Sequence, residues 1–275
     1  EEKRKDPAAR KEAIHAADTV FLCLPDAAAI EAAALAEGSR ARIIDASTAH
    51  RTNPAWDYGF PELSLISKEK IANSSRVANP GCHASGFISL VRPLVDNGIL
   101  PKDALLTCHS VTGYSGGGKK MIADYEDPNK SHLLKAPRQY GLTQQHKHLK
   151  EMQALTGVNI APAFCPIVAD FYSGMEVTVP LFASDIKANI NDIKTLYKNY
   201  YQSSLVHFDD NADEGGFLSA AALSGKDDMQ LCVFGNGDRI ILTARYDNLG
   251  KGASGAAIQN MNILLGINEA EGLNI

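Results

Sequence analysis

The feature that most constrains the fold is a strand–helix–strand pattern near the amino terminus. Residues 19–24 are apolar or small throughout, which is typical of a strand buried on both faces of a parallel sheet. An alanine-rich helix is predicted over residues 27–37 and a second strand over residues 42–45. Because strands joined in this way lie parallel with a right-handed crossover, the sequence predicts an α/β domain with a doubly wound, Rossmann-like parallel sheet.

A sheet of this kind normally begins with a strand and a glycine-rich turn that holds a phosphate. No such pair precedes residue 19. We therefore expect a dinucleotide-binding domain, residues 1–81 and 248–275, that lacks its first strand and glycine loop. A helix predicted over residues 252–266 is expected to return to this domain.

The chain changes character from residue 104 onward, where strands alternate with turns. The predicted strands are residues 104–112, 159–168, 175–182, 205–208, 231–234 and 239–246. Asn236-Gly237 lies between the last two and is a strong hairpin signal. We therefore expect a second α+β domain over residues 82–247, with a mostly antiparallel sheet, that carries the catalytic groups and offers a face for self-association.

Composition excludes several classes of protein. The 275 residues are 45% hydrophobic, which is enough for two ordinary domains. A net charge of -5 gives no basic surface for nucleic acid. No apolar run approaches the roughly 20 residues that a membrane helix needs, and no secretory signal is visible. Five cysteines at irregular spacing favour a reducing compartment, so we expect a cytoplasmic protein.

The most informative candidate for chemistry is Cys82, in the run Asn79-Pro80-Gly81-Cys82-His83. Apolar residues then recur at helical spacing through residue 95, so Cys82 is expected in the first turn of a helix. Unpaired N–H groups and the helix dipole favour a thiolate there, and a thiolate is a nucleophile. The alternative is a small buried apolar residue, as most free cysteines are, and the motif alone leaves both interpretations open.

A second candidate is the pair His146 and His148 with Glu151. On a helix, His148 and Glu151 share a face, and an imidazole oriented by a carboxylate is the usual partner of a nucleophilic thiol. A zinc site would need about four convergent ligands, and no second pair at ligand spacing is in view, so no metal is expected. A solvated basic helix start is the remaining alternative.

Two glycine-rich stretches are suited to anions. Residues 112–120 follow a predicted strand and end in two lysines, so their backbone N–H groups and cations suit a phosphate. Residues 248–257 open a helix with small side chains, which lets a ligand approach the backbone. The alternatives are a flexible loop with solvated lysines and plain close packing of a helix on a sheet.

Together these segments resemble the shorter form of N-acetyl-γ-glutamyl-phosphate reductase, an enzyme of arginine biosynthesis. The matching segments follow the family's order over nearly the whole chain: residues 20–25, 44–51, 58–63, 79–82, 113–119, 146–151 and 248–255. The resemblance implies that Cys82 attacks an acyl phosphate, that NADPH reduces the resulting thioester, and that the product is a semialdehyde.

The resemblance also implies roles for individual residues. His148 or His146 would act as acid–base, and the spacing to Glu151 favours His148. The implied phosphate-binding residues are Ser115, Gly116, Gly117, Lys119 and Arg51. The implied NADP-binding residues are Ser47, Gly252, Ala253, Ser254 and Gly255. A homo-oligomer, dimer or tetramer, is implied as well.

Three alternatives stay open on the sequence alone. Aspartate-semialdehyde dehydrogenase shares the architecture and chemistry, and the Asn-Pro-Gly-Cys and His-Lys-His motifs favour the acetylglutamyl enzyme over it. A thiol hydrolase would not bind a nicotinamide cofactor. A non-catalytic module derived from a dinucleotide domain would have a Cys82 of ordinary reactivity.

Overall fold

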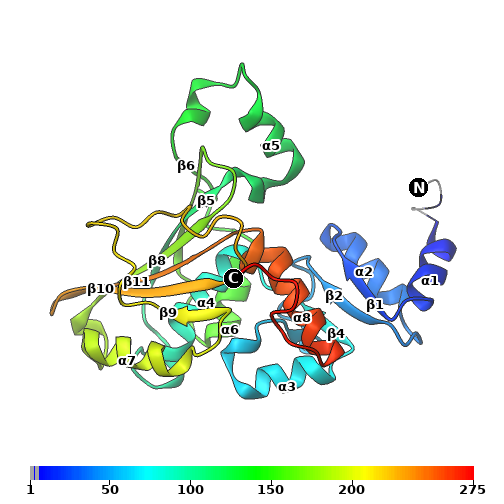
Figure 1. The fold of residues 1–275 in the computed structure, drawn as a ribbon, viewed down its shortest axis with the longest axis horizontal. Helices are drawn as coiled ribbons and strands as arrows, with labels where there is room; N and C mark the ends of the chain where they lie inside the picture. The colour runs from blue at the N-terminus through cyan, green and yellow to red at the C-terminus, as the bar shows by residue number, and fades with distance from the viewer. Residues whose placement is uncertain (1–2, 4–5) are drawn as a thin grey trace. The chain divides into compact units, whose positions relative to one another are not determined.

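The computed structural model describes residue 3 and residues 6–275, which form two compact units (Figure 1). The first contains the chain up to Gly81 together with Ala256–Glu271, and the second contains Cys82–Gly255 and Gly272–Ile275. Residues 1–2 and 4–5, part of the expected first domain, lie outside the described residues. In this division the chain returns to the first unit at Ala256, and residues 250 and 255 pack against residues 226–227 of the second unit. The domain boundary at residue 248 stays a prediction.

The first unit is built on a four-stranded parallel sheet. Its strands, in spatial order, are β1 (Thr19–Leu22), β2 (Arg42–Asp45), β4 (Arg76–Ala78) and β3 (Asp57–Tyr58). Helix α1 (Pro7–His15) precedes β1, and α2 (Asp26–Leu35) connects β1 to β2. Helix α3 (Leu65–Asn73) precedes β4. A short 3-10 turn, η1 (Pro61–Leu63), leads into α3.

Two neighbouring isoleucines of β2 show that this sheet is covered on both faces. Ile43 packs in one apolar cluster with Ile14 of α1 and Ala32 of α2. Ile44, which points to the opposite face, packs in a second cluster with Ile71 of α3 and Ile263 of α8 (Gly255–Leu265). The predicted doubly wound sheet is therefore confirmed, and so is the return of the last helix to it.

The second unit contains a seven-stranded mixed sheet. Its spatial order is β6 (Arg138–Gln139), β7 (Ala163–Ala169), β5 (Thr107–Gly113), β8 (Met175–Phe182), β11 (Arg239–Tyr246), β10 (Met229–Gly235) and β9 (Val206–Phe208). Only the pairs β5–β7 and β9–β10 are parallel. The mostly antiparallel sheet is confirmed, as is the hairpin between β10 and β11, where the Asn236 side chain accepts two backbone N–H bonds.

Three helices cover this sheet: α4 (Cys82–Asp96), α6 (His148–Thr156) and α7 (Ile190–Tyr200). Helix α4 is buried along nearly its whole length and packs on β8 and β11, with α6 against it, whereas α7 packs on β9 and β10. Arg92 of α4 donates to the Leu155 carbonyl of α6, and Tyr197 of α7 donates to the Leu90 carbonyl of α4. The helix that begins at Cys82 is therefore fixed from several sides.

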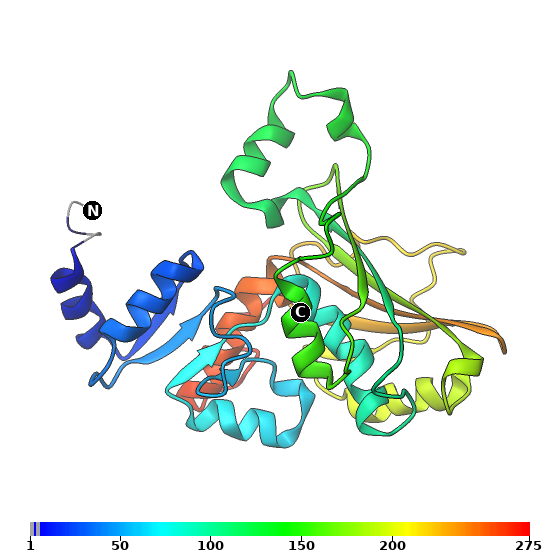
Figure 2. The same ribbon diagram turned by 180° about the vertical axis from the view of Figure 1, so that it is seen from behind.

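The chain between β5 and β6 projects away from the sheet in both views (Figures 1 and 2). It contains η2 (Tyr114–Gly117), α5 (Gly118–Glu126) and η3 (His132–Lys135). A short turn, η4 (Ala183–Asp185), follows β8.

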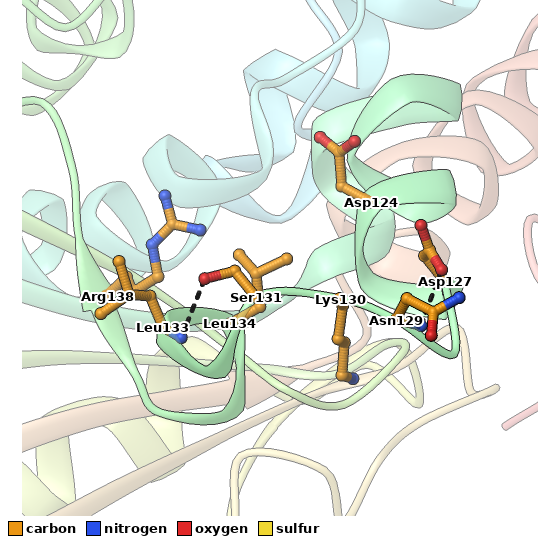
Figure 3. A pocket seen from close by; sticks show the side chains of 8 residues that line it. All are labelled: Asp124, Asp127, Asn129, Lys130, Ser131, Leu133, Leu134 and Arg138. Carbon is orange, nitrogen blue, oxygen red and sulfur yellow. Dashed lines mark hydrogen bonds between the residues drawn. The ribbon is translucent and has the colours of Figure 1, made fainter.

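Between α5 and the segment before β6 lies a cavity of about 400 Å³, lined by residues such as Asp124, Lys130 and Arg138 (Figure 3). None of its lining residues is a predicted site residue. Among the described residues, no helix is long and apolar enough to cross a membrane.

Candidate active site

Cys82 is the first residue of α4, as the sequence predicted. Its side chain is half-buried, whereas the residues that follow it in the helix are buried. Because the first N–H groups of a helix have no partner within the helix, this position carries a positive partial charge that favours the thiolate. None of the five cysteines, all of them described, forms a disulfide.

Three imidazole rings lie together beside the start of α4. The ring centroids of His83 and His148 are 5.6 Å apart, those of His83 and His146 are 5.8 Å apart, and those of His146 and His148 are 4.8 Å apart. Phe164 of β7 packs edge-on against His83 and His146. The predicted histidine pair therefore lies next to the residue that follows Cys82.

Sequence reasoning missed His83 as part of this site. Its Nδ1 lies 2.6 Å from the Ser110 hydroxyl and its Nε2 lies 2.7 Å from the Tyr140 hydroxyl. Burial, with a smaller contribution from His146, lowers the pKa of His83 to about 3. The ring is therefore neutral near pH 7 and does not act as the acid. The only signal in the sequence was its position directly after Cys82.

The other two histidines differ in their surroundings. His146 is half-buried, and burial followed by the charge of Lys147 lowers its pKa. Its Nδ1 accepts the His148 backbone N–H at 3.2 Å, which places the proton of the neutral ring on Nε2. His148 and Glu151 are both buried on the first turn of α6, as expected of residues that share a helix face.

The neutral, buried His83 makes stability depend on pH. In the unfolded chain its pKa is near the ordinary 6.5, whereas in the fold it is about 3, so the unfolded chain binds more protons between these values. Stability is therefore lost as pH falls. Between pH 6.5 and 4 we expect His83 to contribute a loss of about 3 kcal/mol.

Urea unfolding at pH 6.5 and 4 of the wild type, His83→Gln and His132→Gln measures this loss. The fall in unfolding free energy between the two pH values should be smaller in His83→Gln than in the wild type. It should be unchanged in His132→Gln, because His132 is exposed. The same loss in all three proteins would contradict it.

The first glycine-rich stretch does not form a flexible loop. After β5 ends at Gly113, residues 114–117 form η2 and Gly118 begins α5, so Lys119 lies in the first turn of a helix. Gly116, Gly117 and Lys119 are exposed, which leaves the helix end accessible to an anion. Ser115 is buried instead, and its hydroxyl accepts a hydrogen bond from the Asn248 side chain at 2.9 Å.

The second glycine-rich stretch winds as a π-helix, η5 (Gly250–Ser254). A Cβ added to Gly252 would lie 3.1 Å from the Cβ of Cys82, so this backbone lies directly against the cysteine. A Cβ on Gly255 would lie 2.2 Å from the Asp227 carboxylate, so this glycine is required by close packing. Ala253 is half-buried, and the exposed Ser254 hydroxyl donates to the Leu249 carbonyl.

Asn248 joins these two stretches. Its Nδ2 donates to Ser115, and its Oδ1 accepts the Gly174 backbone N–H at 2.9 Å. The adjacent Asp247 carboxylate accepts from the Ser173 hydroxyl and from the Gly225 and Leu249 backbone N–H groups. The glycine-rich stretches are thus parts of one hydrogen-bonded region of the second unit.

Two predicted site residues, Ser47 and Arg51, belong to the first unit. Ser47 follows β2, and its backbone N–H and hydroxyl both donate to the buried Asp45 carboxylate. The Arg51 guanidinium donates to the carbonyls of Asn79 and Ala46. Ligands of parallel sheets bind beyond the carboxyl ends of the strands, where both residues lie.

Comparisons with known proteins agree with this arrangement. Residues 2–74 match the family model "Semialdehyde dehydrogenase, NAD binding domain", and residues 82–248 match "Semialdehyde dehydrogenase, dimerisation domain". The chain is 44% identical to N-acetyl-gamma-glutamyl-phosphate reductase 2 of Nostoc sp., over 98% of this chain and 88% of that protein. It is 41% identical to N-acetyl-gamma-glutamyl-phosphate reductase 2 of Pseudomonas putida, over 99% and 89%. The chain belongs to the N-acetyl-gamma-glutamyl-phosphate reductase family.

Solved structures of similar fold agree with the reductase family's architecture. Aspartate semialdehyde dehydrogenase II from Vibrio cholerae superposes with a TM-score of 0.69 at 16% identity, over 90% of this chain and 79% of that one. Aspartate semialdehyde dehydrogenase from Francisella tularensis gives 0.69 at 15% identity, over 93% and 84%. Within residues 3 and 6–275 of this reductase, no group of three His, Cys, Asp or Glu side chains is arranged to hold a metal ion.

Proposed function

We propose that this chain reduces N-acetyl-γ-glutamyl phosphate to N-acetylglutamate semialdehyde, with release of phosphate, in arginine biosynthesis. The observation that supports it most is the cysteine at the start of α4 with a buried histidine group beside it. The family relationship supplies the substrate. In the net reaction, the acyl phosphate, NADPH and one proton are converted to the aldehyde, phosphate and NADP⁺.

Cys82 is the proposed nucleophile. Its thiolate attacks the acyl carbon, the bond to the phosphate oxygen breaks, and a thioester to Sγ remains. A thioester accepts hydride more readily than a carboxylate, which is the reason for the covalent step. When bound, NADPH supplies that hydride. Collapse of the thiohemiacetal then breaks the carbon–sulfur bond and restores the thiolate.

His148 is the proposed acid–base, with His146 as the alternative. Its ring lies beside that of His83, next to Cys82, and Glu151 lies one turn further along α6. It would protonate the oxyanion that hydride addition creates and remove that proton when the thiohemiacetal collapses. His83 is unsuited to this role because burial lowers its pKa to about 3.

The start of α5 is the proposed phosphate site. Gly116 and Gly117 leave the backbone exposed, and Lys119 supplies a cation. The buried Ser115 fixes the turn through its hydrogen bond with Asn248. Arg51 is proposed as a further phosphate-binding residue on the strength of the family relationship.

Replacing Lys119 with methionine is expected to raise the KM for phosphate in the reverse reaction by roughly 10–100-fold, the usual value of one charge-assisted hydrogen bond. The kcat should change little. The measurement varies phosphate at saturating semialdehyde and NADP⁺. Lys120→Met is the matched control, since Lys120 is also exposed on α5. Equal effects of the two changes would contradict a specific role for Lys119.

The cofactor is proposed to be NADP, and the domain match supports nicotinamide binding. The residues present fit such a group. Small residues follow β2, and the Asp45 carboxylate fixes the shape of the turn that contains Ser47. Ser47 and the stretch Gly252–Gly255 are proposed to contact the cofactor. Fluorescence titration with NADPH and NADH tests this preference.

The deciding experiment is a comparison of substrates in the reverse direction. Purified protein with NADP⁺ and phosphate is given N-acetylglutamate semialdehyde or aspartate semialdehyde, and NADPH formation is followed. Faster turnover of the acetylated substrate is expected. A preference for aspartate semialdehyde would favour the second candidate, which the similar fold of aspartate semialdehyde dehydrogenases suggests. No turnover, with ordinary iodoacetamide reactivity, would favour a non-catalytic module.

Self-association through the uncovered face of the second sheet is also proposed. Pro180 and Phe182 of β8 and Ile241 of β11 are exposed there, on strands paired with each other. The dimerisation-domain match supports a homo-oligomer. We further propose a cytoplasmic location, since the five cysteines form no disulfide.

A further inference from the structure

A tyrosine hydroxyl is inserted into the first turn of α4. The Tyr246 hydroxyl donates to the Cys82 carbonyl at 2.5 Å and accepts the Gly86 backbone N–H at 3.1 Å. In a regular α-helix the N–H of residue 86 would bond directly to the carbonyl of residue 82. The hydroxyl therefore contacts both members of this backbone pair, and one of them is the carbonyl of the residue that carries the thiol.

The surrounding residues provide the space for this hydroxyl. Tyr246 is fully buried at the end of β11. A Cβ added to Gly86 would lie 2.7 Å from the Tyr246 hydroxyl and 2.6 Å from Val177, so any larger residue at position 86 would exclude the hydroxyl. A Cβ added to Gly252 would lie 3.5 Å from the tyrosine ring and 3.1 Å from Cys82.

Two other tyrosine hydroxyls bond to α4 in a different way. Tyr201 donates to the Ser89 carbonyl at 2.8 Å, and Tyr197 donates to the Leu90 carbonyl. Both acceptors lie about two turns beyond Cys82. Tyr201 thus provides a matched case, a buried hydroxyl bonded to a carbonyl of the same helix but remote from the thiol.

We propose that Tyr246 is a positioning residue that anchors the first turn of α4 through the Cys82 carbonyl and thereby fixes Cys82 for attack. This inference rests on the proposed function. Burial, with a contribution from the charge of Cys82, raises the pKa of Tyr246 well above its ordinary value. The hydroxyl therefore stays protonated, and able to donate, over the whole range in which a thiol ionises.

The expected effect follows from geometry. The Tyr246 hydroxyl ties the Cys82 carbonyl to the buried end of β11. Without the hydroxyl, the Cys82 peptide loses this anchor at the end of the helix, where backbone groups have the fewest partners, and it can shift. A misplacement of about 1 Å in a reacting group costs on the order of 10²-fold in rate.

The test compares Tyr246→Phe with Tyr201→Phe, each of which removes one buried hydroxyl. We measure kcat and KM for N-acetylglutamate semialdehyde and NADP⁺, the rate of Cys82 alkylation by iodoacetamide at pH 7, and the urea midpoint. Tyr246→Phe is expected to lower kcat by roughly 10–100-fold with KM within threefold. Alkylation should slow at least threefold, because a displaced Cys82 lies farther from the N–H groups at the helix start that stabilise its thiolate. Tyr201→Phe should leave kcat and alkylation within twofold of the wild type.

The urea midpoint separates positioning from a loss of folding. Tyr246→Phe should shift it no more than Tyr201→Phe, since each change removes one buried hydroxyl that donates to a carbonyl of α4. Equal kcat and alkylation rates in the two variants would overturn the inference. If the wild type turns over neither semialdehyde while alkylation still differs between the variants, the proposed function fails and the positioning role stands.

Discussion

Replacing Cys82 with serine is expected to lower kcat by roughly 10⁴–10⁶-fold, the scale seen when a catalytic nucleophile is removed. A serine hydroxyl at the same helix end does not ionise near neutral pH, so no acyl group can be taken from the phosphate. The measurement is NADPH formation in the reverse direction. NADPH binding and the urea midpoint should stay close to those of the wild type, because the two side chains are nearly equal in size.

Cys23→Ser is the matched control for this change. Cys23 is an exposed cysteine directly after β1, and its replacement should leave turnover within twofold of the wild type. Turnover of Cys82→Ser above about a hundredth of the wild-type rate, measured on protein free of wild-type contamination, would remove Cys82 from the mechanism.

Replacing His148 with asparagine is expected to lower kcat by roughly 10²–10⁴-fold, the usual contribution of general acid–base catalysis. Asparagine keeps polar contacts in the buried first turn of α6 but cannot take up and release a proton at neutral pH. The pH dependence of kcat, measured from pH 5 to 9, should lose the limb that reports the histidine. Alkylation of Cys82 should continue, since the thiol itself is retained.

His146→Asn distinguishes the two histidines. Its ring lies next to that of His148, yet it is only half-buried and its Nδ1 is engaged by a backbone N–H. We expect a smaller loss of kcat than for His148→Asn. If the larger loss and the altered pH profile follow from His146→Asn instead, the two roles are exchanged.

The fold was predictable from the sequence because its main signals are local. The apolar run before α2 and the strand with Ile43 and Ile44 define a sheet covered on both faces, and the clusters around these two isoleucines confirm it. The strands with the clearest alternation or turn signals, β8 and β11, have the predicted bounds. The segment after β5 was less predictable, because its glycines suggested a loop where a helix forms at Gly118.

The site was predictable only in part. The place of Cys82 follows from a corner and a helix pattern that adjoin it in the chain. Tyr246 is 164 positions from Cys82, and no pattern near either residue indicates that they meet. Likewise, Gly252 and Gly255 look alike in the sequence. Only tertiary packing shows that one lies against the cysteine and the other against Asp227.

The π-helix before α8 would allow this segment to lose one residue without moving β11 or α8. The N–H groups of Gly252 and Ser254 bond to carbonyls five residues earlier, at 2.9 and 2.7 Å, rather than four. Loss of one residue within Gly250–Ser254 would let this turn rewind as ordinary α-helix while β11 and α8 keep their ends. The residues of the turn would then rotate by about 100°, the angle per residue of an α-helix, and Gly252 would no longer face Cys82. The segment could therefore fold without the extra residue, but it needs that residue to place Gly252 against Cys82.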